Sequence, residues 1–376
     1  MKMYKCYNIK NITNILIFIV SLFILLIFSK NNFESVKSSV TIFISSIIPS
    51  LFPFIFFTEF ILNTDILKTV QNYTGGLFSK FFHSSRKSSP AIITGFLCGF
   101  PMGSKTVSKL YQKGDISHDE ARKLLLFINN CNPAFILSTI GIGVFYNIKV
   151  GILLAISHYV SSIIIGMFFC KRNSLSIIHE NKQKLNTFDK INSIKDKNTF
   201  EIIKKCIKNT FVTLSMILGF MILFNLLSRV ITTILLVINV NKETLAIISG
   251  LFEVTSGINN IYNLHISVDI KLIITSFMLG FSGLCIISQI YSTISGNNFS
   301  FKELLMSKLL HGIFSMAITY ILLKYTSILD LSAISVYGSV DESIRTEYMY
   351  NMKISYLIST ISIIFIIFIY YLTRKK

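Results

Sequence analysis

The chain has 376 residues, of which 52% are hydrophobic and 14% are charged, and its mean hydropathy is +0.63. Soluble globular proteins carry about 25% charged residues, so this composition excludes a soluble class and indicates an integral membrane protein. A net charge of +18 would suggest nucleic-acid binding in a soluble protein. Here the basic residues lie mostly between apolar stretches, as the positive-inside rule predicts, so no nucleic-acid partner is expected.

The lengths of the apolar stretches predict an all-α polytopic protein with about eight transmembrane helices. They are expected at residues 12–28, 40–62, 124–146, 150–170, 210–238, 244–262, 304–324 and 354–372. Two further apolar segments, 90–104 and 272–288, are interrupted by Gly, Ser or Pro. These two are predicted to be broken re-entrant hairpins rather than full crossings.

Polar stretches divide the chain into two halves. The predicted units are an N-terminal membrane helix (1–39), a first repeat (40–170), a basic linker (171–208), a second repeat (209–324), and a polar loop with a C-terminal membrane helix (325–376). The lysine-rich linker is expected on the cytoplasmic side. Ser117 and Glu120 form a capping box that predicts a helix start, and this helix is expected to break at Asn129–Pro133.

The two hairpin segments resemble each other. "IITGFLCGF" begins at Ile92 and "IITSFMLGF" begins at Ile273, and each follows an apolar segment with one glutamate, Glu59 or Glu253. The order of glutamate-bearing span, broken hairpin and next span therefore occurs twice. Charge bias makes the two halves parallel, although transporters built from hairpin repeats are often inverted.

The breaks predict a binding site. In hydrocarbon, irregular backbone survives only where protein or water surrounds it, and paired interrupted segments point to the site of a transporter. Pro101 lacks an amide hydrogen, while Gly99 and Gly103 permit turns. The predicted substrate-binding residues are Glu59, Thr94, Gly99, Phe100, Pro101, Gly103, Ser104, Lys105, Asn129, Asn130, Asn132, Pro133, Glu253, Thr255, Gly280, Ser282 and Gly283.

Several of these residues allow a simpler interpretation. Lys105 either binds an anion at a helix start or extends to the membrane surface. Glu59 and Glu253 either face a cavity or proton path or lie near an interface, and the asparagines either line the cavity or cap helices. His158 and His311 are interpreted as packing residues, and the six cysteines as small hydrophobes. No metal site, cofactor or catalytic residue is predicted.

Five blocks of sequence resemble a known family. They are "SLFPFIFFTEFIL", "GFPMGSK", "FINNCNPAFILSTIGIGVFYN", "LAISHYVSSIIIG" and "GLFEVTSGI", and they resemble the sporulation integral membrane proteins of the YlbJ type, within the nucleoside-recognition or Gate-domain group. The resemblance covers roughly residues 40–323. It implies a multi-pass protein of the outer forespore membrane that imports dipicolinate and is needed for the spore cortex. Phe100 stands where the family resemblance implies a tyrosine, so a hydrogen bond from that ring is lost.

Three functions remain open at this point. The first is a transporter for a small anionic solute such as dipicolinate, or for a nucleoside-type solute. The second is a membrane scaffold or gate subunit that recruits sporulation partners or forms a homo-oligomer. The third is an intramembrane enzyme, which is not expected because no nucleophile, phosphate-loop or metal motif is found. Besides the solute, the expected partner is the lipid bilayer.

Overall fold

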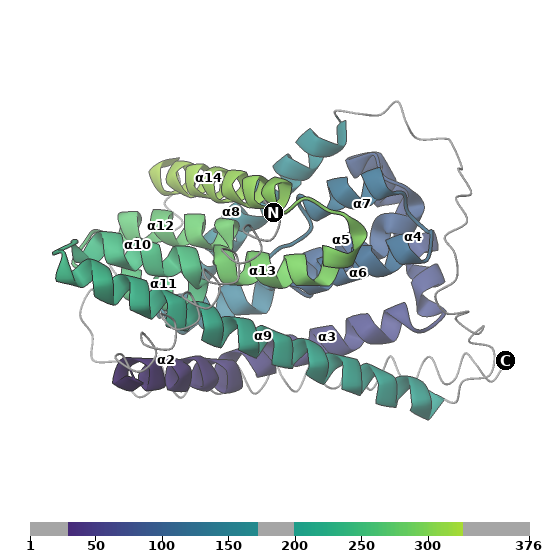
Figure 1. The fold of residues 1–376 in the computed structure, drawn as a ribbon. Helices are drawn as coiled ribbons and strands as arrows, with labels where there is room; N and C mark the ends of the chain where they lie inside the picture. Colours follow the sequence, from purple (N-terminus) through teal and green to yellow (C-terminus); the bar gives the residue numbers. More distant parts are fainter. Residues whose placement is uncertain (1–28, 172–198, 326–376) are drawn as a thin grey trace, which may run out of the picture.

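The computed structural model describes residues 29–171 and 199–325, and the described part of the chain is all-helical (Figure 1). The predicted spans at 12–28 and 354–372, the polar loop and most of the basic linker lie outside the described residues. The helices before the linker are α2 (Ser29–Ile42), η1 (Phe43–Ile47), α3 (Ile48–Leu62), α4 (Ile66–Phe82), η2 (Arg86–Ser88), α5 (Ser89–Leu97), α6 (Met102–Gln112), α7 (His118–Leu125), η3 (Phe135–Ile142) and α8 (Ile148–Lys171). The helices after it are α9 (Thr199–Val237), α10 (Lys242–Phe252), α11 (Val254–Tyr262), α12 (Val268–Phe281), α13 (Gly283–Ile294), η5 (Ser295–Asn297) and α14 (Phe301–Tyr325).

Five helical stretches of the described residues are long and apolar enough to cross a membrane. They are Asn32–Leu62, Ile148–Cys170, Thr199–Val237, Val268–Asn297 and Phe301–Tyr325. The prediction of an all-helical, polytopic protein is therefore confirmed. Helices are found at the predicted spans 40–62, 150–170, 210–238 and 304–324, although α9 begins earlier than expected, inside the predicted linker.

Two predicted spans are not continuous helices. In the stretch 124–146, α7 ends at Leu125, and residues 126–132 are irregular before the π-helical η3 begins. In the stretch 244–262, the helix stops at Phe252 and a new one starts at Val254. The first interruption falls where the sequence predicted a break, at Asn129–Pro133, so that prediction is confirmed. The second was not predicted, because Glu253 caps a new helix start instead of being carried through a helix.

Figure 1 shows how the two halves are arranged. The blue elements α4, α5, α6 and α7 gather at one end, and the green elements α10, α11, α12 and α14 gather at the other. The long α9 runs beside α2 and α3 along the length of the molecule, and α13 reaches from the green end toward α6. The helix breaks therefore lie in the middle, where the two halves meet.

The first interrupted segment folds back on itself through close backbone contact. A Cβ at Gly103 in α6 would lie 2.8 Å from the Cα of Gly95 in α5, and one at Gly95 would lie 2.2 Å from the carbonyl oxygen of Ile128. Between the helices, Gly99 adopts a φ of +79°, which favours glycine. The turn brings α5, α6 and the irregular segment 126–132 into contact at one point.

The second copy breaks at the corresponding place in the repeat. Its helix α12 ends at Phe281, and Ser282 adopts a left-handed φ of 71° before α13 begins at Gly283. The two arms that follow the breaks then pack together: Thr293 donates a 2.9 Å hydrogen bond to Ser104 Oγ, and Asn297 donates one of 2.8 Å to Ser108. Both residue numbers increase in the same direction, so α6 and α13 run parallel where they meet.

An ion pair connects α7 and α14, the helices that follow these arms. The predicted capping box is confirmed, because Ser117 Oγ accepts a 3.2 Å hydrogen bond from the amide of Glu120 at the start of α7. Ser300 caps the amide of Glu303 in the same way at the start of α14. Arg122 lies 3.1 Å from Glu303, so the two helix starts lie at the same end of the protein.

The five cysteines of the described residues are all buried and unpaired, namely Cys98, Cys131, Cys170, Cys206 and Cys285. They are distributed over separate helices and irregular segments, and no group of His, Cys, Asp and Glu in the described part of the chain could hold a metal ion. They act as small apolar packing residues, in agreement with the prediction.

Candidate solute site

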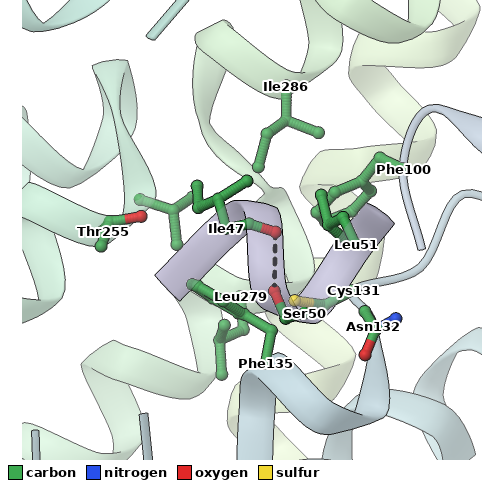
Figure 2. A pocket seen from close by; sticks show the side chains of 11 residues that line it. Ile47, Ser50, Leu51, Phe100, Cys131, Asn132, Phe135, Thr255, Leu279 and Ile286 are labelled. Carbon is green, nitrogen blue, oxygen red and sulfur yellow. Dashed lines mark hydrogen bonds between the residues drawn. The ribbon is translucent and has the colours of Figure 1, made fainter. Parts of the chain in front are cut away.

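Helix interruptions from both halves surround one small cavity (Figure 2). Phe100 comes from the break before α6, Asn132 and Cys131 from the irregular segment, Thr255 from the start of α11, and Leu279 and Ile286 from either side of Ser282. The volume is about 60 Å³. The same cavity is therefore lined by three residues that were predicted to bind substrate and are far apart in the sequence: Phe100, Asn132 and Thr255.

The wall of this cavity is mostly apolar, and the end of η1 and the start of α3 complete it. Ile47, Ser50 and Leu51 line it, and Figure 2 shows Ser50 bonded to the carbonyl of Ile47 rather than to a group across the cavity. A solute-sized pocket is typically about 300 Å³ or more. The cavity is therefore smaller than a typical solute pocket.

The breaks were expected to expose backbone amides and carbonyls, but several of these groups form hydrogen bonds with side chains. Asn129 Oδ1 accepts a 3.1 Å hydrogen bond from the amide of Ser104, near the start of α6. In the irregular segment, Ser162 donates to the carbonyl of Phe127 and Tyr159 donates to the carbonyl of Cys131, both at 2.7 Å. Buried backbone groups need such partners, so these peptide groups are not open to a solute in this conformation.

Glu253 is the cap of a helix rather than a residue within a span. Its side chain is 3% exposed, and its two oxygens accept hydrogen bonds of 3.0 and 2.8 Å from the amides of Thr255 and Ser256. A carboxylate at a helix start also interacts favourably with the helix dipole. Glu253 thereby creates the break between α10 and α11 that places Thr255 in the cavity wall.

The capping role of Glu253 makes a testable prediction. Replacing Glu253 with alanine removes both acceptors and should cost about 1–2 kcal/mol of stability, while Glu253→Gln keeps one acceptor and should cost less. Thermal unfolding of the purified protein in detergent measures both changes. If Glu253 binds solute instead, both variants will keep the unfolding midpoint of the natural chain and lose solute uptake.

Glu59 lies in a compact charged cluster between α3, α6 and α9. Its carboxylate is fully buried and lies 2.8 Å from the ammonium of Lys105 and 3.0 Å from that of Lys109. Asn209 of α9 donates a further hydrogen bond of 2.9 Å. Two cations against one carboxylate leave this cluster with a net charge of +1, so Glu59 does not repel an approaching anion.

Beside this cluster lies a second cavity of about 250 Å³ between α6, α9 and α13. Lys105, Thr213 and Gln289 are among the residues that line it, and Lys105 donates a 2.8 Å hydrogen bond to Thr213. The Lys105 side chain is 23% exposed. Lys105 thus contacts its counter-ion and also lines this cavity.

The remaining predicted residues do not gather at the inner cavity. Thr94 donates to Thr106 within the α5–α6 hairpin, and Gly280 packs against the Gly312 backbone of α14. Asn130 is buried in the irregular segment, and its Oδ1 has no hydrogen-bond partner in the described part of the chain. The rest of the set belongs to the breaks themselves: Gly99, Pro101 and Gly103 in the first, Pro133 at the start of η3, and Ser282 and Gly283 in the second.

One prominent residue near the site was not predicted. The Lys308 side chain of α14 is 1% exposed; it donates to the carbonyl of Asn129 and lies 5.5 Å from the centre of the Phe100 ring. His158 and His311 stand nearby with ring centres 4.5 Å apart. A single lysine within a helix gives little signal in the sequence, because its burial depends on the irregular segment of the other half.

These features define the class of the protein: a polytopic helical membrane protein whose helices are interrupted around a small buried cavity. No family model matches the chain, and no solved structure matches it. Over 317 aligned residues the chain is 27% identical to the sporulation integral membrane protein YlbJ of Bacillus subtilis (strain 168), and 78% of each chain is covered. This similarity confirms the resemblance found in the sequence motifs and supports a YlbJ-type family for the chain.

Proposed function

We propose that the protein is a multi-pass transporter of sporulation that moves a small anionic solute across the membrane. The observation that carries this proposal is the convergence of four helix interruptions, two from each half, around one buried cavity. Such interruptions cost hydrogen bonds in a bilayer and are found where a transporter holds its solute. A scaffold binds its partners through its surface, so its function does not require buried helix interruptions.

The charges near the site favour an anion. Lys105, Lys109 and Lys308 lie close to the breaks, and Glu59 is the only carboxylate paired with any of them within the described residues. The resemblance to YlbJ-type proteins suggests dipicolinate, the outer forespore membrane and a role in cortex formation. Two separate cationic groups are available to a planar dicarboxylate: Lys105, which lines a cavity with Pro101, and Lys308, which lies over the Phe100 ring.

Transport requires the closed region to open. A cavity of about 60 Å³ cannot hold an aromatic dicarboxylate, so the elements around it must separate. In this proposal the α5–α6 segment acts as a re-entrant hairpin within a protein of about eight spans, which includes the spans predicted outside the described residues. The α12–α13 segment lies in one stretch that is long enough to cross the membrane, so the second predicted hairpin is not part of the proposal. Parallel packing of α6 and α13 would then move the two arms together.

Uptake by vesicles that contain only this protein tests the proposal. Proteoliposomes should accumulate dipicolinate faster than protein-free liposomes, and excess unlabelled dipicolinate should compete, whereas a nucleoside such as uridine should not. Uptake of uridine without dipicolinate would favour a nucleoside-type transporter. Absence of any uptake, together with loss of function in cells on deletion of residues 173–198, would favour a scaffold that recruits partners through the basic linker.

A further inference from the structure

Lys308 is a buried cation without a carboxylate partner. Among the described residues no Asp or Glu oxygen forms an ion pair with its ammonium group, and its contacts are the Asn129 carbonyl and the Phe100 ring. Holding an uncompensated charge inside a membrane protein is strongly unfavourable. Such a residue is rare unless a charge of opposite sign arrives during function.

A buried hydrogen-bond donor lies beside it. His158 Nε2 accepts a 3.0 Å hydrogen bond from the amide of Cys131, so the ring is neutral and carries its proton on Nδ1. That Nδ1 is buried and has no hydrogen-bond partner in the part of the chain that the structure describes. His311 Nε2 lies 2.9 Å from the carbonyl of His158 and donates to it. The region thus offers a cation and an unused N–H donor, both of which suit an anion.

Two cavities are lined by neighbours of this position, although neither is lined by Lys308 or His158 themselves. The inner cavity includes Phe100 and Cys131. A larger one, of about 360 Å³, is lined by Ser307, the neighbour of Lys308, and by Arg122, Lys123, Lys302 and Glu303 among others. We call the larger cavity the basic vestibule, since three cationic residues face one carboxylate in its lining. Asp119 lies outside the lining and pairs with Arg122 and Lys123, which still leaves the vestibule with positive charge.

We propose that Lys308 is the anion-binding residue of an inner site, which binds a carboxylate group between its ammonium and the Nδ1–H of His158. Before the solute binds, the Lys308 ammonium contacts the Asn129 carbonyl and the Phe100 ring. A solute entering from the basic vestibule replaces the Asn129 carbonyl, which frees the irregular segment 126–132 to move. The identity of the solute as a carboxylate rests on the proposed function.

The alternative is that Lys308 only stabilises the end of α7 and the irregular segment. Lys308→Gln separates the two roles, because glutamine can still donate to the Asn129 carbonyl but carries no charge. Lys324→Gln is the matched control: it makes the same change on the same helix at an exposed position. Lys308→Met is a second variant that removes the donor as well as the charge.

The experiment measures binding of dipicolinate, with its neutral diamide as a second probe, to the full-length protein in detergent. Calorimetry gives the affinity, and the unfolding midpoint with and without the probe gives an independent measure. Dipicolinate should bind to the natural protein and to Lys324→Gln, and at least about tenfold more weakly to Lys308→Gln. The diamide should bind to none of them. Without the probe, Lys308→Gln should unfold at the same temperature as the natural protein or higher, because a buried charge has been removed.

Every other outcome either supports or overturns the proposed role of Lys308. Equal affinity of Lys308→Gln and the natural protein overturns the proposal while leaving the transport function intact. If both Lys308→Gln and Lys308→Met fail to fold, Lys308 is structural and the proposal is also overturned. If dipicolinate binds in a Lys308-dependent way but vesicles take up none, the anion site is supported and the transport function fails.

Discussion

Replacing Gly95 with alanine should destabilise the protein by roughly 3 kcal/mol or more. The added methyl group would lie 2.2 Å from the carbonyl oxygen of Ile128 and 2.8 Å from its Cβ, so the backbone on one side has to shift. Helix α5 would be forced away from the irregular segment that forms part of the cavity wall. The expected result is a lower unfolding midpoint and a smaller yield of monodisperse protein in detergent.

Gly76→Ala provides the control for this change. Gly76 lies in the middle of α4, and a Cβ there meets no atom within 4 Å, so the same substitution should be neutral or stabilising by up to about 1 kcal/mol. Gly257→Ala is the counterpart in the second half, since its Cβ would lie 2.1 Å from the Cα of Gly250. If Gly95→Ala and Gly76→Ala unfold at the same temperature, the close contact between α5 and the irregular segment is wrong.

Replacing Glu59 with glutamine should have the second large effect. It leaves two ammonium groups facing each other without their carboxylate, in a cluster that holds α3, α6 and α9 together. Removing one partner of a fully buried pair costs about 3–5 kcal/mol. Because the lysine side chains are 23% and 28% exposed and can turn toward water, about 2 kcal/mol is expected here. Solute uptake should also be lost, although the protein still inserts into the membrane.

A double variant tests whether charge repulsion is the cause. In Glu59→Gln combined with Lys109→Met, only Lys105 remains charged, so much of the stability lost in Glu59→Gln should return. Lys109→Met alone should have a small effect, since Glu59 keeps Lys105 and Asn209 as partners. Unfolding midpoints of the four proteins form a double-mutant cycle. Strictly additive losses would show that the two residues act independently and would contradict the cluster.

The sequence predicted features that depend on local chain chemistry. The break at Gly99–Pro101 follows from residues that resist a helix, and the helix start at Ser117 follows from its capping box; the structure has both. The internal repeat predicted the second break, and Ser282 provides it with a left-handed backbone. These signals are contained within a few residues, so a single sequence is enough to find them.

The features that were missed depend on contacts between distant parts of the chain. Glu253 was assigned to the inside of a span, since nothing before it in the sequence indicates that its carboxylate turns to cap the next helix. Helix α4 was not predicted at all. Its apolar residues alternate with polar ones, so it contains no long apolar stretch, and two of its apolar residues, Tyr73 and Leu77, are exposed in the structure. The burial of Lys308 requires the Asn129 carbonyl and the Phe100 ring, which belong to the other half.

The burial of the cysteines has a practical consequence for determining the topology. A water-soluble maleimide cannot reach a thiol that is enclosed by packed side chains, so the natural residues of the described region should give little background. After Cys6 is replaced by serine, one new cysteine at Asn263 and another at Gly296, both exposed, would each report its own side of the membrane. The two opposite ends of the α12–α13 segment could then be assigned to compartments in intact cells, without rebuilding the protein.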